Sequence, residues 1–338
     1  MVVSLPVDAV WSVCLAKYRP ITMTQTSSAS AAESALPLPA RSTATSAGRG
    51  LAAAVGAFVI WGLFPIYLKG LTAVSAEQIT AHRIVWSCVF VLAWLAVLGN
   101  LGSLGAAVKR KGVLVRLLAS AALITFNWLA FAWAVNHDRV LDVSLGYYIG
   151  PLINVLLGVF VLSEKLTRTQ WTAVALAALG VTYLTLTTGQ VPWVALTVAT
   201  SFAVYGLIRK LVSVEALPGL AIEMILLAPF ALAYLLWTHA QGIGAFGHSG
   251  GHVDALLLVS GVVTAVPLLL FSYGARQIPY STMGVLQFIG PSLQLLTGLL
   301  IFAEPFPASR AVGFVLIWIA LLLYAGQGLW QARSRVTA

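Results

Sequence analysis

The chain is built from a succession of long apolar segments, and this feature limits its fold more than any other. After Gly50, apolar runs of about 18–24 residues follow one another, each long enough to cross about 30 Å of hydrocarbon. Charged residues are only 9% of the 338 residues and mean hydropathy is +0.94, whereas a soluble domain carries about 25% charge. The sequence therefore predicts an integral membrane protein in a lipid bilayer and excludes a soluble domain.

Ten such segments can be placed, and within lipid they are expected to be helices because each must satisfy its own backbone hydrogen bonds. Lipid-facing strands would alternate in polarity, and these segments do not. The predicted fold class is an all-α membrane protein with ten transmembrane helices. The expected spans are residues 51–70, 79–99, 113–135, 142–162, 169–187, 191–211, 219–238, 254–276, 281–303 and 308–330.

The basic residues predict the orientation, since Lys and Arg concentrate in cytoplasmic loops. With the N-terminus inside, only four of the 19 Lys and Arg residues lie outside, namely Lys69, Arg83, Arg139 and Arg310. Both termini are therefore expected in the cytoplasm. The net charge of +9 is assigned to this bias, and no nucleic-acid partner is expected.

One apolar pattern occurs twice, at an interval of 140 residues. Ile-Gly-Pro at 149–151 is followed after twelve residues by Glu164, and the same motif at 289–291 is followed by Glu304. Five helices per copy is an odd number, so the second copy enters the membrane inverted. Two inverted five-helix repeats are typical of secondary transporters, which open to either side in turn. The expected organisation is a disordered tail at 1–50, a first repeat at 51–187, an inverted second repeat at 191–330 and a short cytoplasmic tail at 331–338.

The first 50 residues differ in composition from the rest. Residues 22–50 are rich in Ser, Thr and Ala, which is typical of a disordered segment. The stretch before them is too short to span a membrane and lacks the basic start of a signal peptide. We expect the natural start at Met23, with residues 1–22 untranslated.

Polar and kinked positions inside the spans are the candidates for a solute site, because buried polar groups are costly in lipid. Pro151 and Pro291 each free a backbone carbonyl, and Asn154 and Gln294 follow them on the same helical face. Ordinary transmembrane kinks are the alternative. Uncharged hydrogen-bonding groups beside aromatics favour a small, partly apolar solute over an inorganic ion. The residues expected at the cavity are Asn127, Tyr147, Tyr148, Pro151, Asn154, Tyr205, Tyr273, Gln287, Pro291 and Gln294.

Two charged residues inside the spans are repeat mates. Inversion places Arg83 near the outer face and Glu223 near the inner face, so each needs a separate partner. The expected partners are Asp142 or Asp138 for Arg83, and Arg276 or the Arg209–Lys210 pair for Glu223. We interpret these groups as two gates, with snorkelling side chains as the alternative.

Three further polar groups are expected to be mainly structural. His82, beside Arg83, can carry protons near neutral pH, although a lone His near an interface is more often structural. Glu164 and Glu304 lie at helix ends. Thr167 and Gln170 have the spacing of a capping box at the start of the fifth helix.

Six ordered blocks over residues 51–330 resemble the RarD group of EamA-like permeases, in the drug/metabolite transporter superfamily. They are WGLFPIYLKGL, EQITAHRIVWS, NWLAFAWAVN, SLGYYIGPLINVLLG, YGLIRK and TAVPLLLFSYGARQIP. The resemblance implies a bacterial inner-membrane exporter of small metabolites or drugs, with a central cavity and a chloramphenicol-type label. The chain departs from the family pattern at Gly150, where the family has Asn, and at Asp142, where it has Glu.

The predicted function is therefore a secondary transporter that exports small organic solutes. A membrane-embedded enzyme and a channel-like subunit are the alternatives. No catalytic cluster, metal-ligand spacing or Walker loop is apparent in the sequence, so we expect neither a cofactor nor ATP drive. The coupling partner, a proton or a metabolite counter-substrate, is left open, and no oligomer is required.

Overall fold

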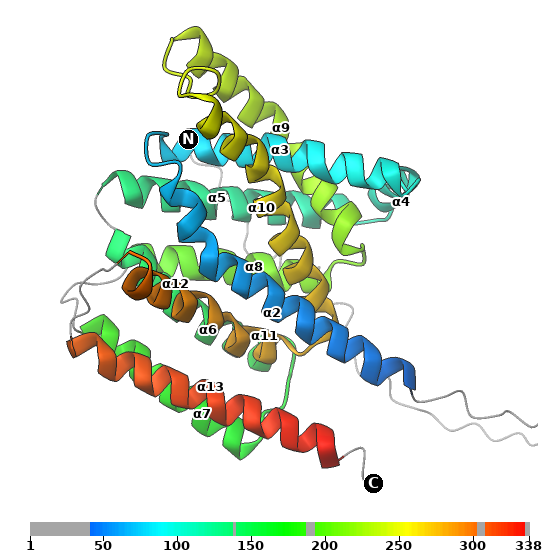
Figure 1. The fold of residues 1–338 in the computed structure, drawn as a ribbon. Coiled ribbons are helices and arrows are strands. Elements are labelled where there is room, and N and C mark those ends of the chain that lie inside the picture. Colours follow the sequence, from blue (N-terminus) through cyan, green and yellow to red (C-terminus); the bar gives the residue numbers. More distant parts are fainter. Residues whose placement is uncertain (1–40, 138–139, 187–192, 303–307, 335–338) are drawn as a thin grey trace, which may run out of the picture. The chain divides into compact units, whose positions relative to one another are not determined.

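The structure is a computed structural model that describes residues 41–137, 140–186, 193–302 and 308–334. All regular elements in these ranges are helices (Figure 1). The helices, labelled as in Figure 1, are α2 (Arg41–Lys69), α3 (Ala76–Val97), α4 (Gly102–Val108), α5 (Val113–Asn136), α6 (Val140–Phe160), α7 (Arg168–Leu186), α8 (Trp193–Leu211), α9 (Ala216–Ala240), α10 (Gly251–Gln277), α11 (Tyr280–Gln287), α12 (Ile289–Leu300) and α13 (Ala308–Ser334).

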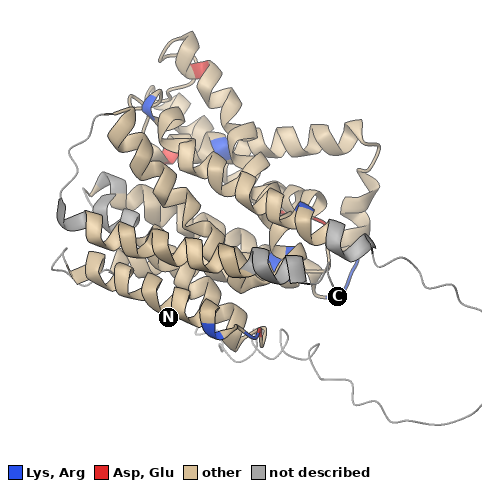
Figure 2. Cartoon of the chain, turned by 60° about the horizontal axis from the view of Figure 1, so that its bottom comes forward, with Lys and Arg blue, Asp and Glu red and all other residues tan. Residues whose placement is uncertain are grey.

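Eight helical segments in the described ranges are long and apolar enough to cross a membrane. Two shorter apolar helices, Leu145–Phe160 and Ala311–Gln327, accompany them. Large apolar side chains face outward, with Val97 86% exposed and Leu300 79% exposed, which fits lipid surroundings better than water. Charged residues are sparse along the helices (Figure 2). The chain is therefore a multi-pass membrane protein.

The structure differs from the sequence-based expectation in three main respects. Helix α2 already begins at Arg41 instead of residue 51, and the short helix α4 was not predicted. The span expected at 281–303 is divided into α11 and α12, with Phe288 between them. The break follows from Pro291, which has no N–H to donate to the carbonyl of Gln287, where α11 ends.

Neighbouring helices approach closely where small residues face each other. Helix α7 packs along α13 (Figure 1), and a Cβ atom added to Gly180 would lie 2.8 Å from the carbonyl oxygen of Gly313. Helix α6 packs on both α8 and α11, and α3 packs on both α9 and α10. Glycine lets two backbones meet at such crossings, where van der Waals packing holds membrane helices together.

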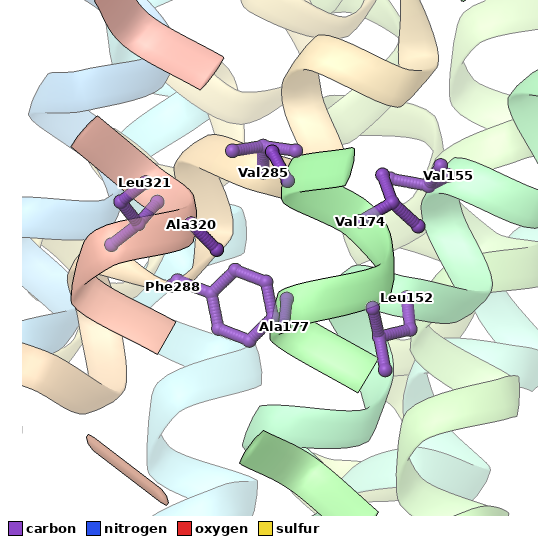
Figure 3. Close-up of a pocket in the computed structure, with 9 residues that line it drawn as sticks. Leu152, Val155, Val174, Ala177, Val285, Phe288, Ala320 and Leu321 are labelled. Carbon is purple, nitrogen blue, oxygen red and sulfur yellow. The ribbon is translucent and has the colours of Figure 1, made fainter. Parts of the chain in front are cut away.

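The seam between α6, α7, α11 and α13 is closely filled. Apolar side chains enclose a gap of only about 10 Å³ there, as Figure 3 shows for Leu152, Val155, Val174, Ala177, Val285, Phe288, Ala320 and Leu321. A space of this size holds at most one water molecule, and its lining offers that molecule few polar partners. We therefore regard this seam as packing and look elsewhere for a solute site.

Candidate solute cavity

A cavity of about 740 Å³ lies between helices from both halves of the chain. Its walls come from α2, α3, α5 and α6 and from α8, α10, α11 and α12. At one end it reaches Thr72, Ala73 and Ser75, which are exposed residues of the turn between α2 and α3. The cavity therefore opens at that end, and its volume falls within the range of about 300–1,000 Å³ that is usual for sites of small organic ligands.

Six of the residues predicted for the site or its gates line this cavity. They are Arg83, Asn127, Tyr147, Gln287, Pro291 and Gln294. Two of the amides are held by backbone carbonyls. Asn127 donates from Nδ2 to the carbonyl of Val198 at 2.8 Å, and Gln294 donates from Nε2 to the carbonyl of Trp61 at 3.1 Å. The polar groups on the wall are therefore fixed in position before any solute arrives.

Asn154 and Pro151 lie behind the wall instead of on it. Asn154 is fully buried and donates from Nδ2 to Oε1 of Gln287 at 2.5 Å. The carbonyl of Pro151 faces Gly284, where an added Cβ atom would lie 2.6 Å from it. The proline face of α6 is thus covered by α11, whereas Pro291 of α12 borders the cavity.

The three remaining tyrosines have different positions. The hydroxyl of Tyr148 donates to the carbonyl of Pro291 at 3.3 Å, so this side chain braces the broken helix from outside. Tyr205 is fully buried, and its hydroxyl has no hydrogen-bond partner among the described residues. Tyr273 is half-buried and does not line the cavity.

Arg83 stands on the cavity wall between two aromatic rings. Its guanidinium carbon lies 4.8 Å from the ring centroid of Trp128 and 5.1 Å from that of Phe64. Its Nε donates to Oγ1 of Thr264 at 2.8 Å. The two expected partners are Asp142 and Asp138. Asp138 and the side chain of Asp142 lie outside the described residues, so a pair of Arg83 with either of them stays a prediction. His82 points away from the cavity wall, with its ring centroid 5.5 Å from that of Phe246.

A buried ion pair lies far along the helices from the open end. Arg209 and Glu223 are 1% and 0% exposed, and their Nη1 and Oε1 atoms are 3.5 Å apart. Ser120 donates to the same carboxylate oxygen, and Nε of Arg209 donates to Oγ of Ser272 at 3.1 Å. Of the two partners expected for Glu223, the structure pairs it with Arg209, while Arg276 donates to the carbonyl of Val214. The pair ties α5, α8, α9 and α10 together.

Further contacts around this pair close the same end. Lys210 donates to the carbonyls of Ala275 and Ile278, each at 2.7 Å. The carboxylate of Glu164 accepts from the backbone N–H groups of Tyr280 and Ser281, at 2.6 and 2.8 Å. The start of α11 is thus fixed by a residue of the first half. No cluster of three potential metal ligands occurs in the described part of the chain.

Comparisons with known proteins agree with this architecture. Residues 48–186 match the EamA-like transporter family. An uncharacterized transporter of Vibrio cholerae is 44% identical over 84% of this chain and 94% of its own length. The protein RarD of Escherichia coli is 38% identical over 84% of this chain and 96% of its own length. The chain belongs to the EamA-like transporter family, in its RarD group.

The fold itself is also found in a solved crystal structure. That structure aligns with a TM-score of 0.64 over 82% of this chain and 96% of its own length, at 16% sequence identity. A likeness at this identity shows the fold alone. For this transporter, therefore, family membership comes from the sequence relatives, and the description of the cavity rests on its own residues.

Sequence reasoning missed several residues that surround the site of this transporter. Phe64 and Trp128 hold Arg83, Thr264 accepts its Nε–H, and Ser120 donates to Glu223. The aromatic residues were visible in the sequence only as part of a generally apolar stretch. Thr264 and Ser120 are single hydroxyls on helices far away in the chain, and nothing local distinguishes them from other membrane hydroxyls.

Proposed function

We propose that this protein is a secondary transporter that exports small organic solutes from the bacterial cytoplasm by alternating access. The observation that carries the proposal is the 740 Å³ cavity, which lies between the two halves, is open at one end and is closed at the other by the buried Arg209–Glu223 pair. A site that faces one side while polar contacts close the other is what alternating access requires. A membrane-embedded enzyme would need clustered acid–base groups at working depth, and the cavity wall offers none among its described residues.

The packing of the helices supports two inverted five-helix repeats. With α4 set aside and α11 and α12 counted as one span, α3 and α9, α6 and α11, and α7 and α13 are repeat mates. Each of these pairs is in direct contact. Contacts between helices that are not repeat mates also occur in pairs related by the same symmetry. The contact of α6 with α8 is matched by that of α2 with α12, where a Cβ atom on Gly62 would lie 2.5 Å from Cβ of Leu293. A pseudo-two-fold axis in the membrane plane accounts for both observations.

The basic residues assign the two ends to the two sides of the membrane. The closed end contains Arg209, Lys210 and Arg276, and the positive-inside rule places it at the cytoplasm. The open end at the α2–α3 turn then faces outward. Both termini lie on the cytoplasmic side of a bacterial inner membrane. Fusions at Ala338 test this topology. A fluorescent protein there should be bright and alkaline phosphatase inactive, and active phosphatase would contradict the assignment.

Solute exchange across a membrane tests the transport function. Purified protein is reconstituted in liposomes loaded with an unlabelled solute, and entry of the labelled solute is followed. Saturable counterflow that is absent from protein-free liposomes supports a secondary transporter. Non-saturable flux would indicate a channel, and turnover of the solute without exchange would indicate an enzyme. A thermal-shift screen against metabolites and antibiotics, chloramphenicol among them, selects the solutes to be tested.

A charge swap tests the proposed outer gate. Arg83→Ala should impair transport, and Arg83→Asp combined with Asp142→Arg should restore part of it. The reason is that the two side chains are expected to meet only when the outer side closes, at a range where attraction is not screened. If the swap restores nothing while both proteins are folded, Arg83 has another role in the cycle.

A further inference from the structure

The guanidinium of Arg83 has an incomplete set of partners. Its Nε–H is satisfied by Thr264, and its faces lie against Phe64 and Trp128. No described residue accepts a hydrogen bond from its two terminal nitrogens, and no described acidic side chain lines the cavity. The part of the guanidinium that remains available therefore faces the cavity.

A cation with no acidic partner among the described residues favours an anionic occupant at this position. Arginine stays protonated in proteins, and a buried charge without a counter-charge is costly. The two aromatic faces offset part of that cost, but they leave the hydrogen-bonding edge of the guanidinium unused. Two parallel N–H groups on one planar edge match the two oxygens of a carboxylate. Because Thr264 fixes Nε, this edge keeps one direction in the cavity.

The other residues on the cavity wall indicate the chemistry of the remaining part of the bound molecule. Trp61, Phe202 and Leu268 provide apolar surface on the wall of the same cavity. Asn127 uses its Nδ2 group for Val198 and Ser201, so its carbonyl oxygen remains to accept a hydrogen bond from a solute. A cavity of 740 Å³ with such walls is far larger than an inorganic anion needs.

We propose that the solute is a small organic monocarboxylate with an aromatic or aliphatic body, and that its carboxylate binds the terminal nitrogens of Arg83. The body lies against Trp61 and Trp128, and a donor group on it reaches the carbonyl oxygen of Asn127. This inference rests on the proposed transport function, because it assumes that the bound molecule is the transported solute. Binding at Arg83 can nevertheless be tested without measuring transport.

Pairs of probes that differ only in charge test the proposal. Full-length protein in lipid nanodiscs is titrated with phenylacetate and phenylacetamide, with indole-3-acetate and its amide, and with hexanoate and hexanamide. We expect at least one carboxylate to bind at least tenfold more tightly than its amide, with an affinity that falls as salt rises. Equal affinities within all three pairs would overturn the proposal, and this arm needs no variant.

Variants then locate the preference. Arg83→Gln should remove the tenfold preference, and Arg83→Lys should keep part of it, because Lys supplies charge without the planar fork. Lys69→Gln is the matched control, since Lys69 is an exposed cation that lies 3.9 Å from the ring of Phe302 and off the cavity wall. If Arg83→Gln does not fold, Thr264→Val frees the guanidinium and should weaken the preference several-fold. A preference that persists in the folded Arg83 or Thr264 variants would overturn the assignment.

Counterflow separates this inference from the proposed function. Saturable exchange of a neutral solute, without exchange of any carboxylate, would overturn the anion site while transport stands. Binding of carboxylates that depends on Arg83, without exchange of any solute, would overturn transport while the site stands. Exchange of a carboxylate that is lost in Arg83→Gln and retained in Lys69→Gln supports both.

Discussion

Under the proposed inverted repeat, Arg83 and Glu223 are mates at opposite ends of the helix bundle, and the structure gives them different surroundings. Arg83 borders an open cavity and is held by rings and one hydroxyl, whereas its mate Glu223 is completely buried and paired with Arg209. An inverted repeat with both halves in the same conformation would give both ends the same environment. In the proposed alternating-access cycle, this difference describes one of two conformations, and the second is expected to exchange the roles of the ends.

Polar contacts tie several helices together at the closed end. Lys210 and Glu164 both bind main-chain groups near the start of α11, and Arg209 binds a carboxylate, a hydroxyl and a carbonyl. Such contacts can be exchanged one for another when helices move, because each of these polar groups can bind more than one kind of partner. An apolar seam such as that between α7 and α13 has no comparable alternative, so we expect it to move as a unit.

The largest effect is expected from breaking the buried pair. Arg209→Met leaves Glu223 buried without its counter-charge, and unfolding should become easier by about 3–5 kcal/mol. The double variant with Glu223→Met should recover most of this loss, because an apolar pair needs no desolvation. Thermal or denaturant unfolding of the purified protein measures both.

Arg83→Met is the matched control at the open end. This arginine borders a cavity that reaches the exposed surface and has no acidic partner among the described residues, so its removal should not destabilise the fold. If Arg83→Met destabilises as strongly as Arg209→Met, the two ends do not differ in the way described here.

The second effect concerns the tie between the halves. Glu164→Gln replaces a carboxylate that accepts two backbone N–H groups by an amide that can accept only with its oxygen, so the loss should be about 1.5–3 kcal/mol. Glu215→Gln is the control, because Glu215 precedes α9 but makes no side-chain hydrogen bond to its first turn. Equal unfolding curves for the two variants would show that Glu164 is dispensable at this position.

The sequence correctly predicted features that depend on residues close together in the chain. Apolar runs predicted the helices, and the spacing of Thr167 and Gln170 predicted a capping box that is confirmed by reciprocal bonds of 2.9 and 3.3 Å. The sequence could not distinguish the two proline faces, since Pro151 and Pro291 have the same local pattern. Their difference arises from packing. Gly284 lets α11 cover Pro151, whereas Pro291 borders the large cavity.

The partners of charged residues were also beyond the reach of the sequence. Glu223 had several basic candidates at similar depth, and the choice of Arg209 depends on how α8 and α9 cross. Gly219 takes part in that choice, because a Cβ atom there would lie 2.3 Å from Nη1 of Arg209. Spacing along one chain does not contain this information, since the two residues belong to helices whose packing is decided by many apolar contacts.

A smaller effect is expected at the capping box beside the closed end. Thr167→Ala removes the side-chain acceptor for the N–H of Gln170 and should cost about 1 kcal/mol of stability. Thr172→Ala, on the exposed side of the same helix, should change stability by about 0.5 kcal/mol or less. An unfolding midpoint that is unchanged in Thr167→Ala would show that α7 does not depend on this cap.

The smallest effect concerns solute affinity, and it separates the wall of the cavity from the layer behind it. Gln287 lines the cavity and Asn154 holds it from behind, so Gln287→Ala removes a wall group and Asn154→Ala removes only its support. Each variant, like Gln294→Ala and Tyr147→Phe, should weaken binding of a transported solute by about 2–10-fold, the value of one uncharged hydrogen bond at 0.5–1.5 kcal/mol. Because Asn154 acts through Gln287, the double variant should be no weaker than Gln287→Ala alone, whereas independent contacts would add. Dissociation constants at equal expression and fold test this. An additive double variant would place Asn154 in direct contact with the solute in another conformation, and unchanged affinity in all four single variants would mean that the solute binds outside this cavity.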